Sequence, residues 1–464
     1  MPMTTTTCAD GLLIVDKPQG VTSFDAVAAV RAALHTKKVG HAGTLDPMAT
    51  GMLVIGFGRA TRLLQYIVEH DKTYEATIRL GLATTTDDAE GDIIPPDDAS
   101  LRSRWRELAA QPLTGVSSCS RWRELAAEPT EGGSPDASDG DATSAARLRA
   151  VIASTIAERF TGDIEQIPNT FSAIKIDGKR AYDLARAGKD VALKARPVHI
   201  AEFTMLATRE GLASTSDAAS PLVPRSRNGA DAPQLDPTSC SRWRELSAQL
   251  TEGGLEVEQT EAVVPVIDVD VRVSCSSGTY IRALARDLGA ALGVGGYLTR
   301  LRRTRVGRFA LSDDRSGLAQ TTVLPAVTDA GIGDDATGTG ETATATMQAI
   351  AAHAEPKTFT NRDGETVTRN RCVLDTPAGL SGDARGDWLR ARAVGMADAA
   401  RGAMPVVAIT ADEARELRFG RRIDRELEKG VHYAAIVPET RDVAAIIERA
   451  NRTQAKPAVV FPAE

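Results

Sequence analysis

The sequence is poor in residues that bind metals or form disulfides. Its 464 residues include only five cysteines, and an odd number does not suit a disulfide framework: Cys8, Cys119, Cys240, Cys275 and Cys372. No two of them stand at the spacing of a zinc site, and the six histidines are equally scattered. We therefore predict that this chain has no metal site.

Long apolar runs are also missing. No window approaches the roughly 18 consecutive apolar residues of a membrane-spanning helix. The first residues, MPMTTTTCADG, lack the basic segment and apolar stretch of a secretory signal. The expectation is a cytoplasmic protein without a membrane partner, long enough for two or three domains.

An overall excess of positive charge is absent too. The net charge is −7, which argues weakly against a nucleic-acid partner. Charge is unevenly distributed, however: residues 272–308 hold eight arginines against one aspartate, or +7, whereas residues 81–148 hold six arginines against thirteen acids, or −7. A local basic patch matters more for phosphate binding than the sum over the chain, so a nucleic-acid partner stays open.

The apolar patterns indicate a mixture of strands and helices. Residues 11–34 suggest a strand, a turn and a helix capped by Thr22 or Ser23, and residues 51–58 a short buried strand. Residues 72–81 alternate between apolar and polar side chains, as do the residues that precede a helix starting near Thr279. This pattern predicts an α/β or α+β core with a one-sided sheet.

Two segments interrupt that pattern. Residues 97–143 and 208–253 are rich in Ser, Gly, Asp and Pro, and they carry three copies of SRWREL, starting at 103, 120 and 241. We predict that both are mostly disordered insertions, with a repeated docking peptide as the alternative. Residues 313–346 are predicted to be a linker between a domain at 1–312 and a C-terminal region at 347–464.

One short stretch, GHAGTLDPMATGML from residue 40, holds an aspartate in a glycine-rich turn before an apolar strand. Pro47 pushes Asp46 towards extended geometry, and the strand gives the loop a rigid anchor. Spacing alone favours a structural Asp-Pro turn. No nucleophile elbow and no second nearby acid support a hydrolase triad or a glycosidase pair. A lone carboxylate and a distant arginine cluster suit nucleophilic or base catalysis on a nucleic acid.

Several segments together resemble the bacterial tRNA pseudouridine-55 synthase family, in that family's order. They cover most of residues 11–200 and 264–310: GLLIVDKPQGVTS, KKVGHAGTLDPMATGMLVIGFGRATR, DKTYEATIRLG, FTGDIEQIP, FSAIKIDGKRAYDLARAG and SGTYIRALARDLG. The resemblance implies an α+β fold in which helices flank a mixed, mostly antiparallel sheet. It also implies a small RNA-binding domain of the PUA type at about 401–464.

The resemblance further implies an isomerase, active as a monomer on tRNA without metal or cofactor, that converts uridine 55 of the T-arm to pseudouridine. Asp46 would be the nucleophile and Arg282 its ion-pair partner. The flipped uridine would contact His41, Tyr74, Tyr280 and Leu301, and Lys17 would be structural or touch a phosphate. Arginines after the last helix of this part would contact RNA phosphates: Arg300, Arg302, Arg303, Arg305 and Arg308. The alternatives are a non-catalytic tRNA-binding or RNA-folding protein with the same fold, and an unrelated aspartate-dependent hydrolase.

Overall fold

The computed structural model describes most of the chain. The described residues are 9–94, 98–110, 139–172, 174–176, 179–181, 184, 193–219, 223–224, 263–311, 321–325, 344–360 and 364–463. The SRWREL copies at 120 and 241, and most of the predicted linker, lie outside them. Within the described part, no helix is long and apolar enough to cross a membrane.

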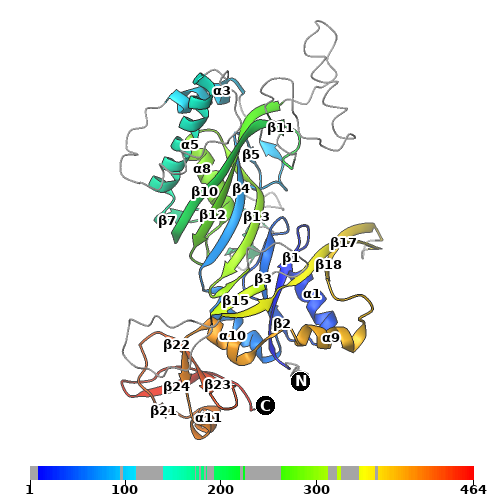
Figure 1. Cartoon of the computed structure of the whole chain (residues 1–464), viewed down its shortest axis with the longest axis vertical. Helices are drawn as coiled ribbons and strands as arrows, with labels where there is room; N and C mark the ends of the chain where they lie inside the picture. The colour runs from blue at the N-terminus through cyan, green and yellow to red at the C-terminus, as the bar shows by residue number, and fades with distance from the viewer. Residues whose placement is uncertain are drawn as a thin grey trace.

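A single large sheet runs through most of the molecule (Figure 1). Its main path is β11-β10-β12-β4-β13-β3-β1-β17-β18, and β2, β7, β14 and β19 pair at its margins. Two neighbouring pairs on this path, β1–β17 and β3–β13, are parallel, and the others are antiparallel. The predicted α+β fold with a mixed, mostly antiparallel sheet is therefore confirmed.

The long strands of this sheet are β1 (Gly11–Lys17), β3 (Thr50–Phe57), β4 (Lys72–Leu80), β10 (Arg196–Ser214), β12 (Val263–Cys275), β13 (Gly296–Val306), β17 (Ile350–Thr360) and β18 (Thr366–Leu374). Its short strands are β2 (Val39–His41), β7 (Gly162–Gln166), β11 (Val223–Pro224), β14 (Phe309–Ala310) and β19 (Val394–Gly395). Three small hairpins are formed by β5 (Ala83–Thr84) with β6 (Ile93–Ile94), β8 (Lys175–Ile176) with β9 (Lys179–Arg180), and β15 (Thr321–Pro325) with β16 (Thr344–Gln348).

Helices cover parts of both sheets and connect their strands. They are α1 (Ser23–Leu34), η1 (Gly58–Arg62), α2 (Leu64–Val68), α3 (Asp98–Ala110), α5 (Asp139–Arg159), α8 (Ile281–Leu292), α9 (Gly382–Arg390), α10 (Met396–Ala403) and α11 (Ala411–Arg418). Thr22 and Asp25 form a capping box at α1, as its sequence predicts. Helix α8 begins one residue after Tyr280 and ends at Gly293 in the left-handed conformation.

Parts of the two predicted insertions are ordered, and the rest of both lies outside the described residues. Helix α3 occupies residues 98–110, α5 starts at Asp139, and β10 continues to Ser214. The first SRWREL copy is part of α3: its Trp105 is buried and donates from Nε1 to the Pro265 carbonyl at 3.3 Å. Arg104 Nε donates to the Leu292 carbonyl at 2.7 Å, at the end of α8. The segment is ordered because the apolar side of its helix covers the sheet and α8.

The C-terminal end of the chain forms a second sheet, with the order β20-β22-β23-β24-β21. Its strands are β20 (Val406–Ala408), β21 (Ile423–Asp424), β22 (His432–Val437), β23 (Asp442–Arg449) and β24 (Gln454–Val460). Helix α11 packs on this sheet, and Thr410 and Glu413 form a capping box at its start. That this domain is of the PUA type stays a prediction. The proposed boundary at 347 does not match the sheets, because β17 and β18 join the large one.

Candidate active site

The Asp46 loop, residues 42–49, joins β2 to β3, and its backbone is fixed from two sides. Buried Lys17 at the end of β1 donates from Nζ to the carbonyls of Ala49 at 2.6 Å and of Pro47 at 3.3 Å. Ser23, on α1, exchanges two hydrogen bonds with the backbone of Leu45, at 2.8 and 3.0 Å. The side chain of Asp46 between these anchors stays 38% exposed. The loop therefore presents one carboxylate from a rigid backbone.

Arg282 pairs with that carboxylate. Its Nη2 lies 3.0 Å from Asp46 Oδ2, and its own side chain is only 6% exposed. The same guanidinium donates to the carbonyls of Thr86 at 3.0 Å and Phe171 at 2.9 Å. The family motif placed these two residues together, and the structure brings them into contact. Asp46 thus has a charged partner across the sheet, which a purely local Asp-Pro turn would not need.

Asp88 is a member of this site that the sequence analysis missed. Its Oδ2 lies 3.2 Å from Arg282 Nη1, and its side chain is 4% exposed. Thr86 Oγ1 and the backbone N–H of Glu90 donate to Asp88 Oδ1, at 2.6 and 3.0 Å. Arg282 is therefore held between two carboxylates, one buried and one exposed. The signal was the TTTDDAEG turn after the Tyr74 strand, which was hidden in a long acidic stretch.

Tyr74 and Leu301 lie on adjacent strands. Tyr74, on β4, is 8% exposed and pairs in register with Arg303 of β13, while buried Leu301 of β13 pairs with Ala76. Burial raises the pKa of the Tyr74 phenol, and the Asp46 carboxylate acts in the same direction. Both side chains are uncharged at neutral pH, and β13 places them beside the start of β3. Their contact with the flipped uridine stays a prediction.

Tyr280 and His41 complete the predicted substrate contacts. Gln166 fixes the backbone of Tyr280 by bonding to both its N–H, at 2.8 Å, and its carbonyl, at 3.0 Å. Burial raises the pKa of the Tyr280 phenol, and Asp46 contributes to this shift. Burial and the Arg303 charge lower the pKa of His41, so its imidazole is neutral at pH 7. Within the described part of the chain, its buried Nδ1 has no hydrogen-bond partner.

The arginines of β13 and the following turn differ in how far their side chains are exposed and therefore free to contact RNA. Arg303 is 1% exposed, and its guanidinium donates to the carbonyls of Met52 at 2.9 Å and Gly43 at 3.0 Å. Its predicted phosphate contact is therefore wrong, because the buried guanidinium of Arg303 hydrogen-bonds to the Asp46 loop and to β3 instead. Arg302 pairs with both oxygens of Asp16, and Arg305 donates to Thr73 Oγ1. Arg300 and Arg308 are exposed.

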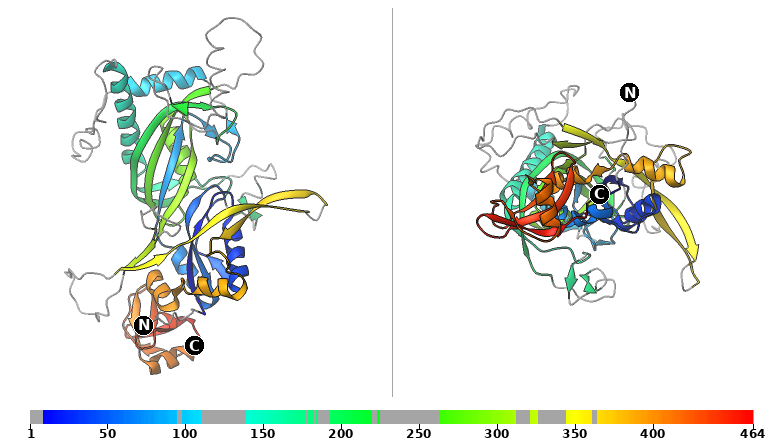
Figure 2. Two further views of the ribbon diagram at one scale, coloured as in Figure 1. Left: turned by 45° about the vertical axis from the view of Figure 1, so that its right-hand side comes forward. Right: turned by 90° about the horizontal axis from the view of Figure 1, so that it is seen from below.

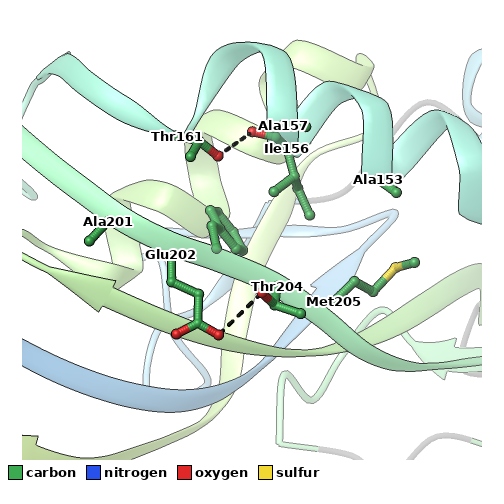
Figure 3. A pocket seen from close by; sticks show the side chains of 9 residues that line it. Ala153, Ile156, Ala157, Thr161, Ala201, Glu202, Thr204 and Met205 are labelled. Atoms are coloured by element: carbon green, nitrogen blue, oxygen red, sulfur yellow. Dashed lines mark hydrogen bonds between the residues drawn. The ribbon is translucent and has the colours of Figure 1, made fainter. Parts of the chain in front are cut away.

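A pocket lies elsewhere, between α5 and β10 (Figure 3). Its lining is mostly small and apolar: Ala153, Ile156, Ala157, Thr161, Ala201, Glu202, Phe203, Thr204 and Met205. Glu202 is its one carboxylate, and it accepts hydrogen bonds from Thr204 and from Ser274. None of the predicted site residues lines it, so the pocket is not part of the Asp46 site.

The described residues contain no group of three or more His, Cys, Asp or Glu side chains that could hold a metal ion. At the candidate site, the guanidinium of Arg282 lies between the carboxylates of Asp46 and Asp88. Arg282 thus supplies the positive charge that offsets the repulsion between the two neighbouring carboxylates.

Three family models match the sequence. "TruB family pseudouridylate synthase (N terminal domain)" matches residues 31–117 and 134–218. "tRNA pseudouridylate synthase B C-terminal domain" matches residues 282–327, and "tRNA Pseudouridine synthase II, C terminal" matches residues 404–462. The first match contains Asp46 and Asp88, and the second contains Arg282, so the two sides of the site fall in different matched segments.

Curated relatives match over nearly the whole length. The chain is 56% identical to a tRNA pseudouridine synthase B of Bifidobacterium longum (strain DJO10A), over 98% of this chain and 99% of that one. It is 41% identical to a tRNA pseudouridine synthase B of Arthrobacter sp. (strain FB24), over 66% of this chain and 69% of that one. A solved H/ACA RNP chain bound to a substrate RNA overlaps with a TM-score of 0.44 at 17% identity, covering 98% of this chain and 85% of that one.

Proposed function

The chain belongs to the TruB family of pseudouridylate synthases and is an isomerase acting on tRNA, and on that premise we propose that Asp46 is the nucleophile that isomerises uridine 55 in the T-arm. The observation that carries this proposal is the ion pair between Asp46 and Arg282, 3.0 Å long, with the carboxylate 38% exposed. A reactive carboxylate must be fixed and still accessible to substrate, and Asp46 is both.

The reaction breaks the N1–C1′ bond of the uridine and forms a C5–C1′ bond after the base has rotated. N1 gains a proton and C5 loses one, so no electrons are exchanged with a co-reactant. Asp46 would form the covalent intermediate that holds one part of the nucleotide while the base turns. Arg282 would orient the carboxylate through a charge-assisted hydrogen bond, and Asp88 would hold the guanidinium from its other side.

Uridine 55 lies within the folded T-arm, so the enzyme must extrude it. Extrusion costs about a few kcal/mol, and a flipped base needs an apolar or aromatic surface to rest on. We assign this surface to Tyr74, Leu301 and Tyr280. Both phenols are neutral at pH 7, and burial raises their pKa further. His41, neutral at pH 7, would bind the nucleotide by hydrogen bonding rather than by charge.

RNA phosphate contacts would help to offset the cost of extrusion. Arg300 and Arg308 are exposed, and Arg302 and Arg305 are half-buried, so these four remain in the proposed set. The C-terminal domain, within the match at 404–462, would bind the tRNA further from the target uridine. Its PUA character is part of this proposal.

The test is tritium release from a tRNA transcript labelled at C5 of its uridines, because the C5 proton leaves only when the new bond forms. Wild type should release one equivalent of tritium per site, and Asp46→Asn should release none while it still binds tRNA. Release by Asp46→Asn would disprove the assigned nucleophile. Binding by the wild type without release would favour the alternative of a non-catalytic tRNA-binding protein. Release from a tRNA whose uridine 55 is replaced by cytidine would disprove the assigned position.

A further inference from the structure

A two-stranded ribbon leaves the large sheet beside the Asp46 loop. Strand β17 pairs with β1 only at Val15–Ile350 and Asp16–Ala351, and it then continues with β18 alone to Thr360. Because β1 ends at Lys17, which lies level with Ala352 in this parallel register, residues 353–360 extend past the carboxyl end of β1. Eight extended residues span about 26 Å. Figures 1 and 2 show this ribbon in yellow, projecting from the body of the molecule.

Midway along the ribbon, where Asn370 pairs with Pro356, β18 is hydrogen-bonded to the backbone that supports Asp46. Asn370 Nδ2 donates to the Gly20 carbonyl at 3.2 Å. The N–H of Gly20 donates to the carbonyl of Pro47, the residue after Asp46, at 2.8 Å. A substrate bound at Asp46 therefore lies at the edge from which the ribbon extends.

The two faces of the ribbon carry different side chains, because successive residues of a strand point to opposite faces. One face carries the cross-strand threonine pairs Thr358–Thr368 and Thr360–Thr366. The other carries Lys357 directly opposite Arg369, followed by Phe359 opposite Val367. We call this second set of four residues the cationic face.

Lys357 and Arg369 form a pair of like charges without compensation. Both are exposed, and neither has an acidic partner among the described residues. The next pair on this face, Glu355–Arg371, is by contrast a salt bridge of 2.8 Å. Like charges directly opposite each other destabilise a strand pair. Binding an anion between them would remove that cost, and Phe359, 41% exposed, offers an aromatic surface next to it.

We propose that the cationic face binds the sugar–phosphate backbone of the tRNA away from the target uridine, an inference that rests on the proposed function. Lys357 and Arg369 contact phosphates, and Phe359 packs against a base or ribose, the combination that RNA-binding surfaces use. Lys357 lies six residues beyond Ala351, or about 20 Å along the strand. Neither side chain lies at Asp46, so the ribbon adds binding energy without taking part in the isomerisation step.

The test compares the double variant Lys357→Ala/Arg369→Ala with wild type. We expect the Kd for a full tRNA transcript to rise about tenfold, and the slope of log Kd against log salt to fall by about 1.5, the value for two phosphate contacts. Single-turnover tritium release from a T-arm stem-loop should stay at the wild-type rate. The melting temperature should not fall, because a repulsive pair has been removed.

Thr358→Ala/Thr368→Ala is the matched control, since it changes the adjacent cross-strand pair, on the opposite face of the ribbon. An unchanged tRNA Kd and salt slope in the cationic variant would overturn the proposal. An equal loss in the threonine variant would overturn it too, because the ribbon's structure rather than its charge would then be responsible. Unchanged tRNA binding by the cationic variant together with lost affinity for polyglutamate would also overturn the proposal, and would indicate an acidic protein partner. A wild type that releases no tritium from the stem-loop would disprove the proposed function instead.

Discussion

At the scale of single residues, Arg282 connects the two acids of the site. It is the only guanidinium for which the described residues show contacts to both Asp46 and Asp88. Because Asp88 is buried and fixed by Thr86 and by the Glu90 backbone, it sets where the arginine lies.

The first prediction concerns Asp88. Asp88→Asn keeps the shape of the side chain but leaves Arg282 with a single acid, so we expect kcat to fall about 10- to 100-fold by loss of orientation. KM and the Kd for tRNA should change little, since the side chain of Asp88 is only 4% exposed. Asp92→Asn, an exposed acid of the same turn, is the control and should keep wild-type kcat. Equal rates for Asp88→Asn and wild type would contradict this role.

The second prediction concerns Lys17. Burial lowers its pKa to about 8, from 10.5 in an unfolded chain. Between these values the unfolded state binds more protons, so the Lys17 contribution to the free energy of unfolding should rise as pH increases from about 8 to 10.5. Below pH 8 both states are protonated and this gain is absent. The melting temperature of wild type relative to Lys17→Met should therefore rise from pH 8 to 10.

Lys429→Met provides the control, because Lys429 is exposed in the C-terminal domain. Its difference from wild type should stay constant over the same range. If the difference in melting temperature between wild type and Lys17→Met stayed constant or fell with rising pH, the lowered pKa of the buried Lys17 amine would be contradicted.

The sequence could predict the loop of Asp46 and its distant partner, but not which arginines of β13 are free. Arg303 and Leu301 are two residues apart on β13, so their side chains point to the same face of the sheet. This could have indicated that Arg303 is buried. A register shift between Arg303 and Arg305 then interrupts the alternation of side chains, so spacing alone does not predict which face Arg305 occupies. Asp88 was missed because the carboxylate acquires its role only when α8 brings Arg282 to it across the sheet.

At the scale of elements, helix α3 shows why composition is a poor guide to order. Its polar sequence still places Leu101, Trp105 and Leu108 in the main core. The copies at 120 and 241 have serines, Ser118 and Ser239, where α3 has Leu101. Leu101, two residues before the first SRWREL copy, could therefore have predicted a buried helix face for that copy alone.

The third prediction tests this packing. Trp105→Ala removes a large buried side chain and the donor to Pro265, so we expect a loss of about 3–5 kcal/mol in the free energy of unfolding. Trp105→Phe should lose much less, because most of the apolar contact remains. Arg106→Ala, exposed on the same helix, is the control and should lie within about 0.5 kcal/mol of wild type. Similar melting temperatures for Trp105→Ala and Arg106→Ala would mean that α3 does not support the core.

At the scale of the whole molecule, the C-terminal domain is joined to the catalytic sheet by apolar packing. One hydrophobic cluster contains Leu12, Ile14 and Val54 of the large sheet together with Ile446 and Phe461 of the small one. Polar contacts accompany it: Arg59 and Arg62 donate to the carbonyls of Pro462 and Val460, at 2.8 and 2.6 Å. Residues far apart in the sequence therefore share one core, which a domain division by sequence pattern alone cannot predict.

This shared core leads to the fourth prediction, that both sheets unfold together. Phe461 is fully buried, and Phe461→Ala should cost about 3–5 kcal/mol and lower the melting temperature of the catalytic part as well. Phe419 of the same small domain is 70% exposed, so Phe419→Ala is the matched control and should leave that temperature unchanged. Calorimetry should show one transition in both variants. If Phe461→Ala instead separated two transitions, with the tritium-releasing activity lost only at the upper one, the small domain would be an independent unit and the cluster would not couple it to Asp46.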